Sequence, residues 1–198
     1  MTPIAIVKPA LFAAALTPGA ALAWNAYTGD LTANPVDYIT DQTGSWALAC
    51  LITSLTITPL RRLTGWNDLI KLRRMIGLFA FFYATLHMLT WFALVSFFDV
   101  PAMIEDVTMR PFITIGMATF LILFVLAITS NRAAIRRLGR RWQRLHRLVY
   151  LAAIGAVIHF WWLVKADITE PRRWAVALAI LLGFRAWWTW RTRTLSRS

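Results

Sequence analysis

The residues best suited to hold a metal ion or to move a proton are the chain's three histidines, His87, His146 and His159. His87 and His159 each lie about twelve residues inside a long apolar segment, counted from the basic cluster that precedes it. If both segments cross a membrane in the same direction, the two imidazoles lie at nearly the same depth on different helices. Imidazoles placed in this way can hold the iron of one haem from its two faces.

His146 lies thirteen residues before His159, which is about 20 Å along a helix and places it near a membrane surface. Two haems at these depths could carry an electron across the bilayer in steps. Thirteen residues leave the two side chains roughly 140° apart on a regular helix, so either a bend near Gly155 realigns them or they serve different neighbours. A hydrogen bond between helices is the alternative for any membrane histidine. It stays open for His146, and the matched depth disfavours it for the other two.

Other metal sites would need ligands that the sequence does not place at the depth of His87 and His159. Zinc sites use three or four ligands, and no further Cys, His or carboxylate falls there. The one cysteine, Cys50, cannot form a disulfide within the chain or build an iron–sulfur site. No acid lies mid-segment to relay protons. The sequence therefore predicts His87 and His159 as axial ligands of a haem b, and His146 as a candidate ligand of a second haem.

The composition places these histidines in a membrane protein. Of the 198 residues, 59% are hydrophobic and 15% are charged, whereas a soluble domain is about a quarter charged. The apolar residues also occur in long blocks. The net charge of +12 would suggest nucleic-acid binding in a soluble protein. Here the basic residues flank the apolar blocks and no nucleic-acid-binding fold accompanies them, so we expect no nucleic-acid partner.

Six segments are long and apolar enough to be predicted as membrane spans. They cover residues of about 6–24, 45–60, 75–98, 112–130, 146–164 and 174–190. The predicted fold is an all-α integral membrane protein, a six-helix transmembrane bundle that forms a single domain over residues 1–198. Residues 1–23 have a second interpretation, because Ala21-Leu22-Ala23 resembles a signal-peptidase site. We favour a retained helix, since Lys8 is the only early charge.

The charges alternate between the two sides of these spans. Seventeen of the 21 basic residues fall on one side, at Lys8 and in the segments 61–74, 132–147 and 185–197. Eight of the nine acidic residues fall on the other side: Asp30, Asp37, Asp41, Asp99, Glu105, Asp106, Asp167 and Glu170. The positive-inside rule makes the basic side cytoplasmic. Both termini are then predicted to be cytoplasmic, as an even number of spans requires.

A haem would also account for some small and basic residues, although each has an ordinary explanation. Gly77, Gly116 and Gly155 could let a flat cofactor approach the backbone, but small residues are common where membrane helices pack. Arg110 and the Arg136–Arg144 cluster, with Lys165, could pair with haem propionates or with a phosphate-bearing cofactor. We favour topology as the reason for these charges.

Several separate stretches resemble one known family. They are ITPLRRLTG (57–65), RRMIGLFAFFYATLH (73–87), RPFITIG (110–116), LGRRWQRLHRLVYL (138–151) and IHFWWLVK (158–165). In this order and spacing they resemble the MsrQ family, the haem-binding membrane subunits of bacterial periplasmic methionine-sulfoxide reductase systems, within the ferric-reductase-like transmembrane group. The resemblance covers a core of about 44–165.

The resemblance implies cofactors and partners that composition alone does not. Members of the family carry haem b in a helical bundle in the bacterial inner membrane and are associated with FMN. They take electrons from the quinone pool or from a cytosolic flavin reductase. They deliver them to a periplasmic molybdopterin enzyme, MsrP, which reduces methionine sulfoxide in oxidised envelope proteins. The chain carries no C-terminal FAD and NADPH domain, so we expect it to need a separate donor.

The family's histidines fall on His87, His146 and His159, with His87 and His159 as the axial pair of the periplasmic-side haem. The wider ferric-reductase group has four such histidines. The place of the fourth, thirteen or fourteen residues before His87, holds Arg74 or Arg73. The resemblance therefore implies one haem and leaves a second haem at His146 open.

We expect this chain to be the electron-transfer subunit of an oxidoreductase complex and not its catalytic subunit. Two alternatives stay open: a self-sufficient cytochrome b-type quinone or ferric reductase, and a non-redox membrane scaffold. The periplasmic loops at 25–44, 99–111 and 165–173 are the candidate docking surfaces for a periplasmic partner. The sequence does not locate the FMN or quinone sites.

Overall fold

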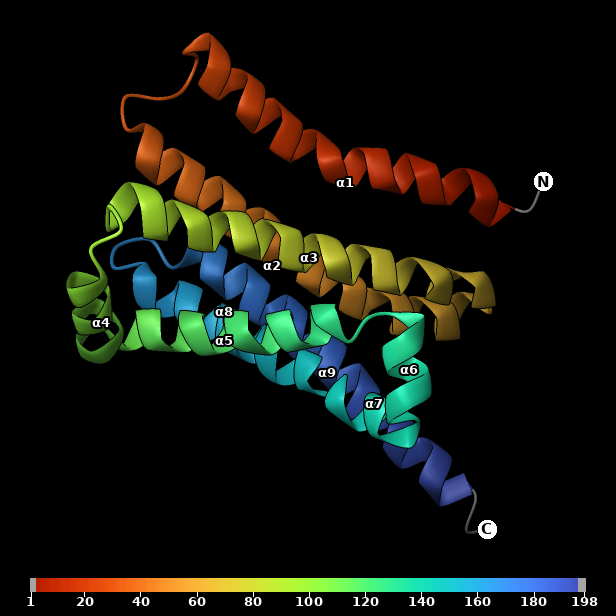
Figure 1. Ribbon diagram of the computed structural model, residues 1–198. Coiled ribbons are helices and arrows are strands. Elements are labelled where there is room, and N and C mark those ends of the chain that lie inside the picture. The colour runs from red at the N-terminus through yellow and green to blue at the C-terminus, as the bar shows by residue number, and fades with distance from the viewer. Residues whose placement is uncertain (1–2, 196–198) are drawn as a thin grey trace.

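The computed structural model describes residues 3–195, and within that range every regular element is helical. Long helices run along a common direction, and short ones lie across the two ends of the bundle (Figure 1). The helices are α1 (Pro3–Thr28), α2 (Pro35–Thr64), α3 (Ile70–Thr90), α4 (Val100–Met109), α5 (Pro111–Ile128), α6 (Arg132–Leu138), α7 (Arg140–Leu145), α8 (Leu148–Leu163) and α9 (Thr169–Leu195). A 3₁₀ turn, Asn67–Leu69, precedes α3, and a π-helical turn, Trp91–Val95, extends it.

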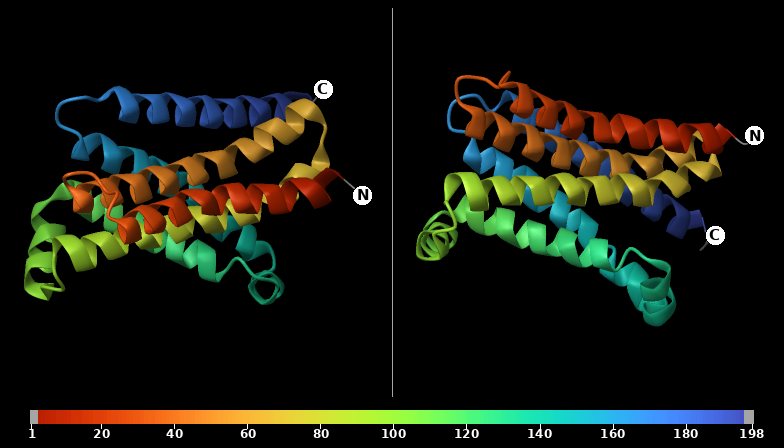
Figure 2. Two further views of the ribbon diagram at one scale, coloured as in Figure 1. Left: turned by 90° about the horizontal axis from the view of Figure 1, so that it is seen from above. Right: turned by 45° about the horizontal axis from the view of Figure 1, so that its top comes forward.

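The bundle is built from two closely packed helix pairs. Helix α2 packs along α3, and α5 packs along α8; α9 lies against α2 and α8. Helix α1 lies along the outside of the bundle, where it contacts α2 and α3 (Figure 2). Helix α1 begins and α9 ends at the same end of the bundle, the end at which α6 and α7 lie (Figure 1).

Five of the described helical segments are long and apolar enough to cross a membrane: Ile4–Thr28, Pro35–Thr64, Asn67–Val95, Pro111–Ile128 and Arg140–Leu163. They correspond to the first five predicted spans. The sixth predicted span, 174–190, lies inside α9, which has 27 residues but carries several arginines. The sixth crossing therefore stays a prediction. In the basic segment 185–197, residues 196 and 197 lie outside the described range.

Local sequence signals account for where the helices begin and end. Prolines occupy the first turns of α2, α4 and α5, where the missing N–H costs no helical hydrogen bond. The Asp99 carboxylate caps α4 by accepting a hydrogen bond from the backbone N–H of Ala102 at 3.2 Å. Gly65 ends α2 with a φ of 71°, a left-handed conformation that glycine adopts readily. The chain then reverses into α3.

One helix begins two residues later than its approximate predicted boundary, which affects a candidate ligand. The sequence suggested that His146 begins a continuous span, but the structure places His146 at the end of α7, in a turn before α8. The backbone N–H of Tyr150 bonds to the carbonyl of Arg147 and not to that of His146, so the regular ladder is interrupted here. The angle of 140° between His146 and His159, which assumes a regular helix, therefore does not apply.

The core lies between α2 and α3 and extends to α8 and α9. Its most deeply buried members are Leu51, Leu55, Leu72, Ala80, Tyr83, Ala152 and Ala153. Many large apolar side chains on the outer surfaces of the long helices are exposed in the isolated chain, among them Phe12, Leu121 and Ile180. Such an apolar exterior suits a lipid environment.

The hydroxyl of Tyr83 on α3 anchors the outer helix α1. It donates to the carbonyl of Ala15 at 2.7 Å and accepts from the N–H of Gly19 at 3.0 Å. In a regular helix these two backbone groups would bond to each other. The hydroxyl has thus been inserted into the ladder of α1 next to Pro18, where the helix is already interrupted.

The helical hydrogen-bond pattern is interrupted a second time in α2, and there the side chain of Arg185 supplies the missing donor. Pro59 has no N–H, so the carbonyl of Leu55 lacks its usual partner four residues on. The guanidinium of Arg185 on α9 donates to that carbonyl at 2.6 Å and to the Tyr150 hydroxyl on α8 at 2.7 Å. One side chain therefore connects three helices and satisfies a backbone group that water cannot reach inside a bilayer.

We predict an energetic coupling between Arg185 and Pro59. Arg185→Met should lower the free energy of unfolding by about 1–3 kcal/mol, because the Leu55 carbonyl loses its partner. In a Pro59→Ala background the alanine N–H can take over, so the same substitution should cost at least about 1 kcal/mol less. Unfolding of the four proteins of this cycle in detergent measures both costs. Equal costs in the two backgrounds would contradict the assignment.

Candidate functional site

The first candidate ligand, His87, is held by α3 against α2. Its Nδ1 lies 3.0 Å from the carbonyl oxygen of Thr40. A Cβ at Gly44, one turn further along α2, would lie 3.1 Å from the imidazole ring. The ring can therefore approach α2 because residue 44 has no side chain. The sequence analysis did not single out Gly44.

The second candidate ligand, His159, is held by α8 against α5 in the same manner. Its Nδ1 lies 2.7 Å from the carbonyl oxygen of Phe112. A Cβ at Gly116, one turn further along α5, would lie only 2.7 Å from Nδ1. Side chains do not approach this closely, so Gly116 is required for this position of the ring. The suggestion that Gly116 permits a close approach has a structural basis here, in which the approaching group is the imidazole.

The two helix pairs repeat one local design. In each pair the carbonyl that bonds to the histidine precedes it by 47 residues, and the glycine stands one turn after the carbonyl. The residues between these positions differ between the two pairs, so the repeat is not evident from sequence similarity. The shared spacing of glycine and histidine was the signal that could have revealed it.

The imidazoles of His87 and His159 face each other across the two helix pairs. Their ring centres are 6.1 Å apart and their planes are inclined by 81°. A carbonyl oxygen can only accept a hydrogen bond, so in each ring Nδ1 carries the hydrogen and Nε2 keeps a free lone pair. Histidine ligands in metalloproteins are oriented by such a hydrogen bond from the second nitrogen.

The separation of the rings fits one metal ion between them. Bonds from a metal to an imidazole nitrogen are about 2 Å long, which puts the centres of two rings on opposite sides of the metal about 6 Å apart. A haem iron needs only two protein ligands of this kind, since the macrocycle supplies the others. Among residues 3–195 no group of three or more His, Cys, Asp or Glu side chains is placed to hold a bare metal ion.

The third histidine, His146, has a different environment. Its Nε2 lies 3.1 Å from the hydroxyl of Thr129, and its ring stacks on Trp142 with the ring centres 3.9 Å apart. Trp142 in turn donates to the carbonyl of Thr129 at 2.9 Å. Both nearby side chains therefore hold His146 at the turn between α7 and α8. The hydrogen bond between helices, left open by the sequence, is present in this structure.

Arg73 and Arg74, which hold the place of the family's fourth histidine, lie in the first turns of α3, near the basic end of the bundle. His146 lies at the same end, well separated along α8 from His159.

The remaining residues suggested by the sequence lie apart from the two imidazoles of the pair. A Cβ at Gly155 would meet the Thr119 hydroxyl at less than 2.5 Å, so this glycine serves the contact between α5 and α8. A Cβ at Gly77 would meet nothing within 4 Å. Arg110 forms an exposed ion pair with Asp106 at 3.1 Å, which agrees with a surface role.

The chain matches a known family model over more than half of its length. The model described as the ferric reductase like transmembrane component matches residues 43–157. This range includes His87 and His146, and it ends just before His159. No solved structure matches the chain.

Full-length relatives extend the match beyond that range. A protein of Herminiimonas arsenicoxydans is 48% identical over 194 residues, covering 96% of this chain and 89% of the relative. A protein of Bordetella pertussis is 48% identical, with 96% and 94% covered, and one of Ralstonia nicotianae is 46% identical, with 93% and 87% covered. All three are named protein-methionine-sulfoxide reductase heme-binding subunit MsrQ. The chain therefore belongs to the ferric-reductase-like transmembrane family and, within it, to the MsrQ family of haem-binding subunits.

Proposed function

We propose that this chain carries electrons through a haem b held between His87 and His159 to a periplasmic molybdopterin methionine-sulfoxide reductase, MsrP. The electrons come from a quinol or from a cytosolic flavin reductase, and the complex repairs oxidised methionine in envelope proteins. The facing pair of imidazoles carries the proposal: the rings are 6.1 Å apart and both Nε2 atoms are free. A scaffold would have no need for this arrangement.

The residues of the chain orient the ligands, and the haem, when bound, supplies the one-electron couple. The carbonyls of Thr40 and Phe112 accept from Nδ1 and so fix the tautomer and the direction of each ring. The absence of side chains at Gly44 and Gly116 lets the rings reach these carbonyls. The rings are thereby aligned before an iron arrives, which lowers the entropy cost of binding it.

The proposed orientation puts the imidazole pair in the periplasmic half of a bacterial inner membrane. Thr40 lies five residues into α2, at the acidic end of the bundle. The basic segments, including α6 and α7, gather at the opposite end, which is cytoplasmic by the positive-inside rule. With α9 as the sixth crossing, both termini are cytoplasmic. Electrons then leave the haem on the side where the reductase works.

The loops at the acidic end are the proposed docking surface for the reductase. Between α3 and α4, Phe97 and Phe98 are 78% and 63% exposed, and both have positive φ values, of 48° and 61°. Non-glycine residues in this region are strained, and such strain often marks binding segments. In the loop before α9, hydrogen bonds from Thr169 hold the pKa of Asp167 below its usual value.

A second haem and an FMN remain part of the proposal on the strength of the family resemblance. His146 is the only remaining histidine, and Arg74 or Arg73 stands where the wider group has a partner histidine. His146 is therefore proposed as the ligand of a second haem or as a group that tunes electron entry at the cytoplasmic side.

Electron delivery to the reductase tests the proposed function directly. The haem of the membrane protein, reduced with dithionite under anaerobic conditions, should be reoxidised when the periplasmic reductase and methionine sulfoxide are both added. It should stay reduced when either is omitted. A colourless, well-folded protein would favour the scaffold. A haem that stays reduced when the reductase and methionine sulfoxide are both present would favour the self-sufficient quinone or ferric reductase.

We predict that His87→Ala and His159→Ala each abolish the low-spin b-type signal in the dithionite-reduced minus oxidised spectrum, or convert it to high spin. Each substitution removes one of two axial ligands. His146→Ala should keep the low-spin signal of the pair. An unchanged signal in either of the first two variants would place the axial ligands elsewhere.

We also predict that a single methyl group at Gly116 weakens haem binding. Gly116→Ala places a Cβ 2.7 Å from Nδ1 of His159, which must then move. Overpacking of this kind costs about 1–3 kcal/mol, or roughly 5- to 150-fold in haem affinity. Gly44→Ala, with its contact at 3.1 Å, should have a smaller effect. Haem titration of the apoprotein measures both.

Gly77→Ala is the matched control, because nothing lies within 4 Å of the added Cβ. It introduces the same change on the helix that carries His87. If Gly116→Ala and Gly77→Ala bound haem with equal affinity, the close approach of α5 to His159 would not matter for the site.

A further inference from the structure

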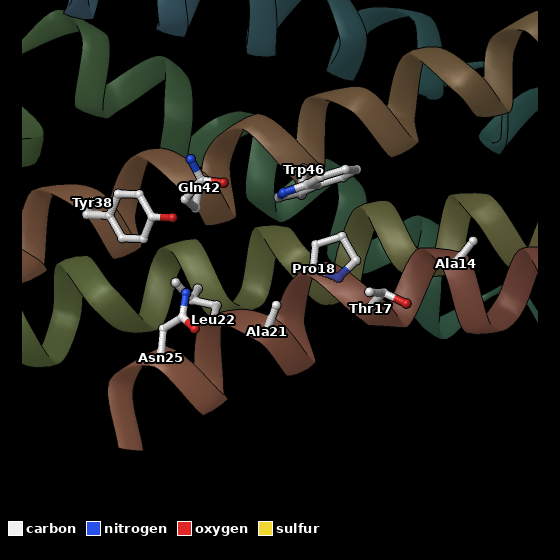
Figure 3. A pocket seen from close by; sticks show the side chains of 9 residues that line it. All are labelled: Ala14, Thr17, Pro18, Ala21, Leu22, Asn25, Tyr38, Gln42 and Trp46. Carbon is white, nitrogen blue, oxygen red and sulfur yellow. The ribbon is translucent and has the colours of Figure 1, made fainter. Parts of the chain in front are cut away.

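A groove between α1 and α2 is separate from the imidazole pair and has no role so far. Its volume is about 510 Å³, within the range of small-molecule sites. Helix α1 supplies Pro18, Leu22 and Asn25, and α2 supplies Tyr38, Gln42 and Trp46, among others (Figure 3). Because both helices are candidate spans and α1 lies outside the bundle, the groove is reached from the bilayer (Figure 2).

Besides the Thr17 hydroxyl, which donates to the Ala13 carbonyl at 2.9 Å, and the indole of Trp46, three polar side chains line this mainly apolar groove. They are the carboxamides of Asn25 and Gln42 and the hydroxyl of Tyr38 (Figure 3). Among the hydrogen bonds of residues 3–195, none uses these side-chain groups. All three residues are half-buried, so their polar groups can bond to a ligand that enters the groove. A lipid acyl chain has no atom that could do so.

The lining also restricts the charge of the ligand. No Lys, Arg, Asp or Glu is among the nine residues that line the groove. A phosphate-bearing cofactor or a carboxylate would have no cation to balance it here. The ligand that fits is therefore neutral and lipid-soluble, with oxygen atoms for the three polar groups and a flat body for Trp46 and Pro18.

The groove and the imidazole of His87 lie on opposite faces of the same turns of α2. Thr40 and Gly44, which are one turn apart, face His87. Gln42 lies midway between them in the sequence, about 200° around the helix from either, and it faces the groove. A ligand beside Gln42 is thus separated from the imidazole pair by about one helix diameter, 10–12 Å. That separation is short enough for direct electron transfer.

We propose that the groove between α1 and α2 binds the quinol that reduces the haem. This inference rests on the proposed function and names where its lipid-soluble donor binds. The amide of Gln42 and the hydroxyl of Tyr38 hold the oxygens of the ring, Asn25 lies at the membrane-surface end, and the isoprenoid tail leaves toward the bilayer.

The step balances with the reaction that the complex performs. Each quinol breaks two O–H bonds and becomes the quinone, releasing two electrons and two protons. The electrons pass one at a time to the ferric haem iron. The protons leave to the water at the acidic end of the bundle, where α2 begins. Reduction of one sulfoxide to a thioether takes two electrons and two protons and releases one water, so one quinol serves one repair.

Reduction of the haem by decylubiquinol, with the protein in phospholipid nanodiscs, tests the site. Gln42→Leu and Tyr38→Phe each remove one hydrogen bond and should slow the reduction about five-fold, and the double variant roughly 25-fold. Leu22→Trp, which fills the groove and leaves the polar groups in place, should raise the quinol concentration needed for half the maximal rate.

Two matched variants carry the same chemical changes away from the groove. Gln143→Leu changes an exposed glutamine on α7, and Tyr27→Phe changes a tyrosine that is 85% exposed on α1. Both should reduce at the wild-type rate. Full reduction by dithionite, with unchanged spectra, should be common to all variants and reports that the haem and the fold are intact.

The outcomes separate this inference from the proposed function. Equal rates for the wild type and the Gln42→Leu/Tyr38→Phe double variant would overturn the location of the site. A wild-type haem that dithionite reduces and decylubiquinol does not would overturn the quinol as occupant, leaving the haem in place. Absence of any haem signal would instead contradict the proposed function, electron transfer through a haem.

Discussion

The hydrogen bond from each imidazole to a helix carbonyl is the interaction on which the arrangement of this bundle depends. It holds His87 to α2 and His159 to α5, and in both places a glycine one turn further along the accepting helix leaves room for the ring. The same two contacts direct both free nitrogens into the space between the helix pairs. The close packing of α2 with α3 and of α5 with α8 thus serves two purposes: it buries apolar surface, and it positions the two imidazoles.

The histidines at the two ends of the bundle have different surroundings. At the acidic end, two imidazoles face each other with backbone carbonyls behind them. At the basic end, His146 is hydrogen-bonded to Thr129 and stacked on Trp142. Coordination of a metal by Nε2 of His146 would have to replace its hydrogen bond to Thr129.

Prolines interrupt the helical ladder in this protein, and polar side chains from other helices compensate. Arg185 donates to the carbonyl that Pro59 leaves free in α2, and the Tyr83 hydroxyl enters the ladder of α1 beside Pro18. In water such carbonyls would be solvated, but a bilayer offers no partner. The groove between α1 and α2 presents the reverse case, since there the polar groups are the side chains of Asn25, Tyr38 and Gln42 and not backbone carbonyls.

The sequence by itself determined the class of protein, the approximate position of the first five spans, the distribution of charge and the matched depth of His87 and His159. Apolar length, charge and counting along a helix are properties of consecutive residues, so they can be read without knowing how helices pack. Only the tertiary structure decided the rest. The bonds from His87 to Thr40 and from Arg185 to Leu55 join residues 47 and 130 positions apart. The role of Gly44, the turn at His146 and the groove beside Gln42 depend equally on which faces of which helices meet, and packing between distant segments settles that.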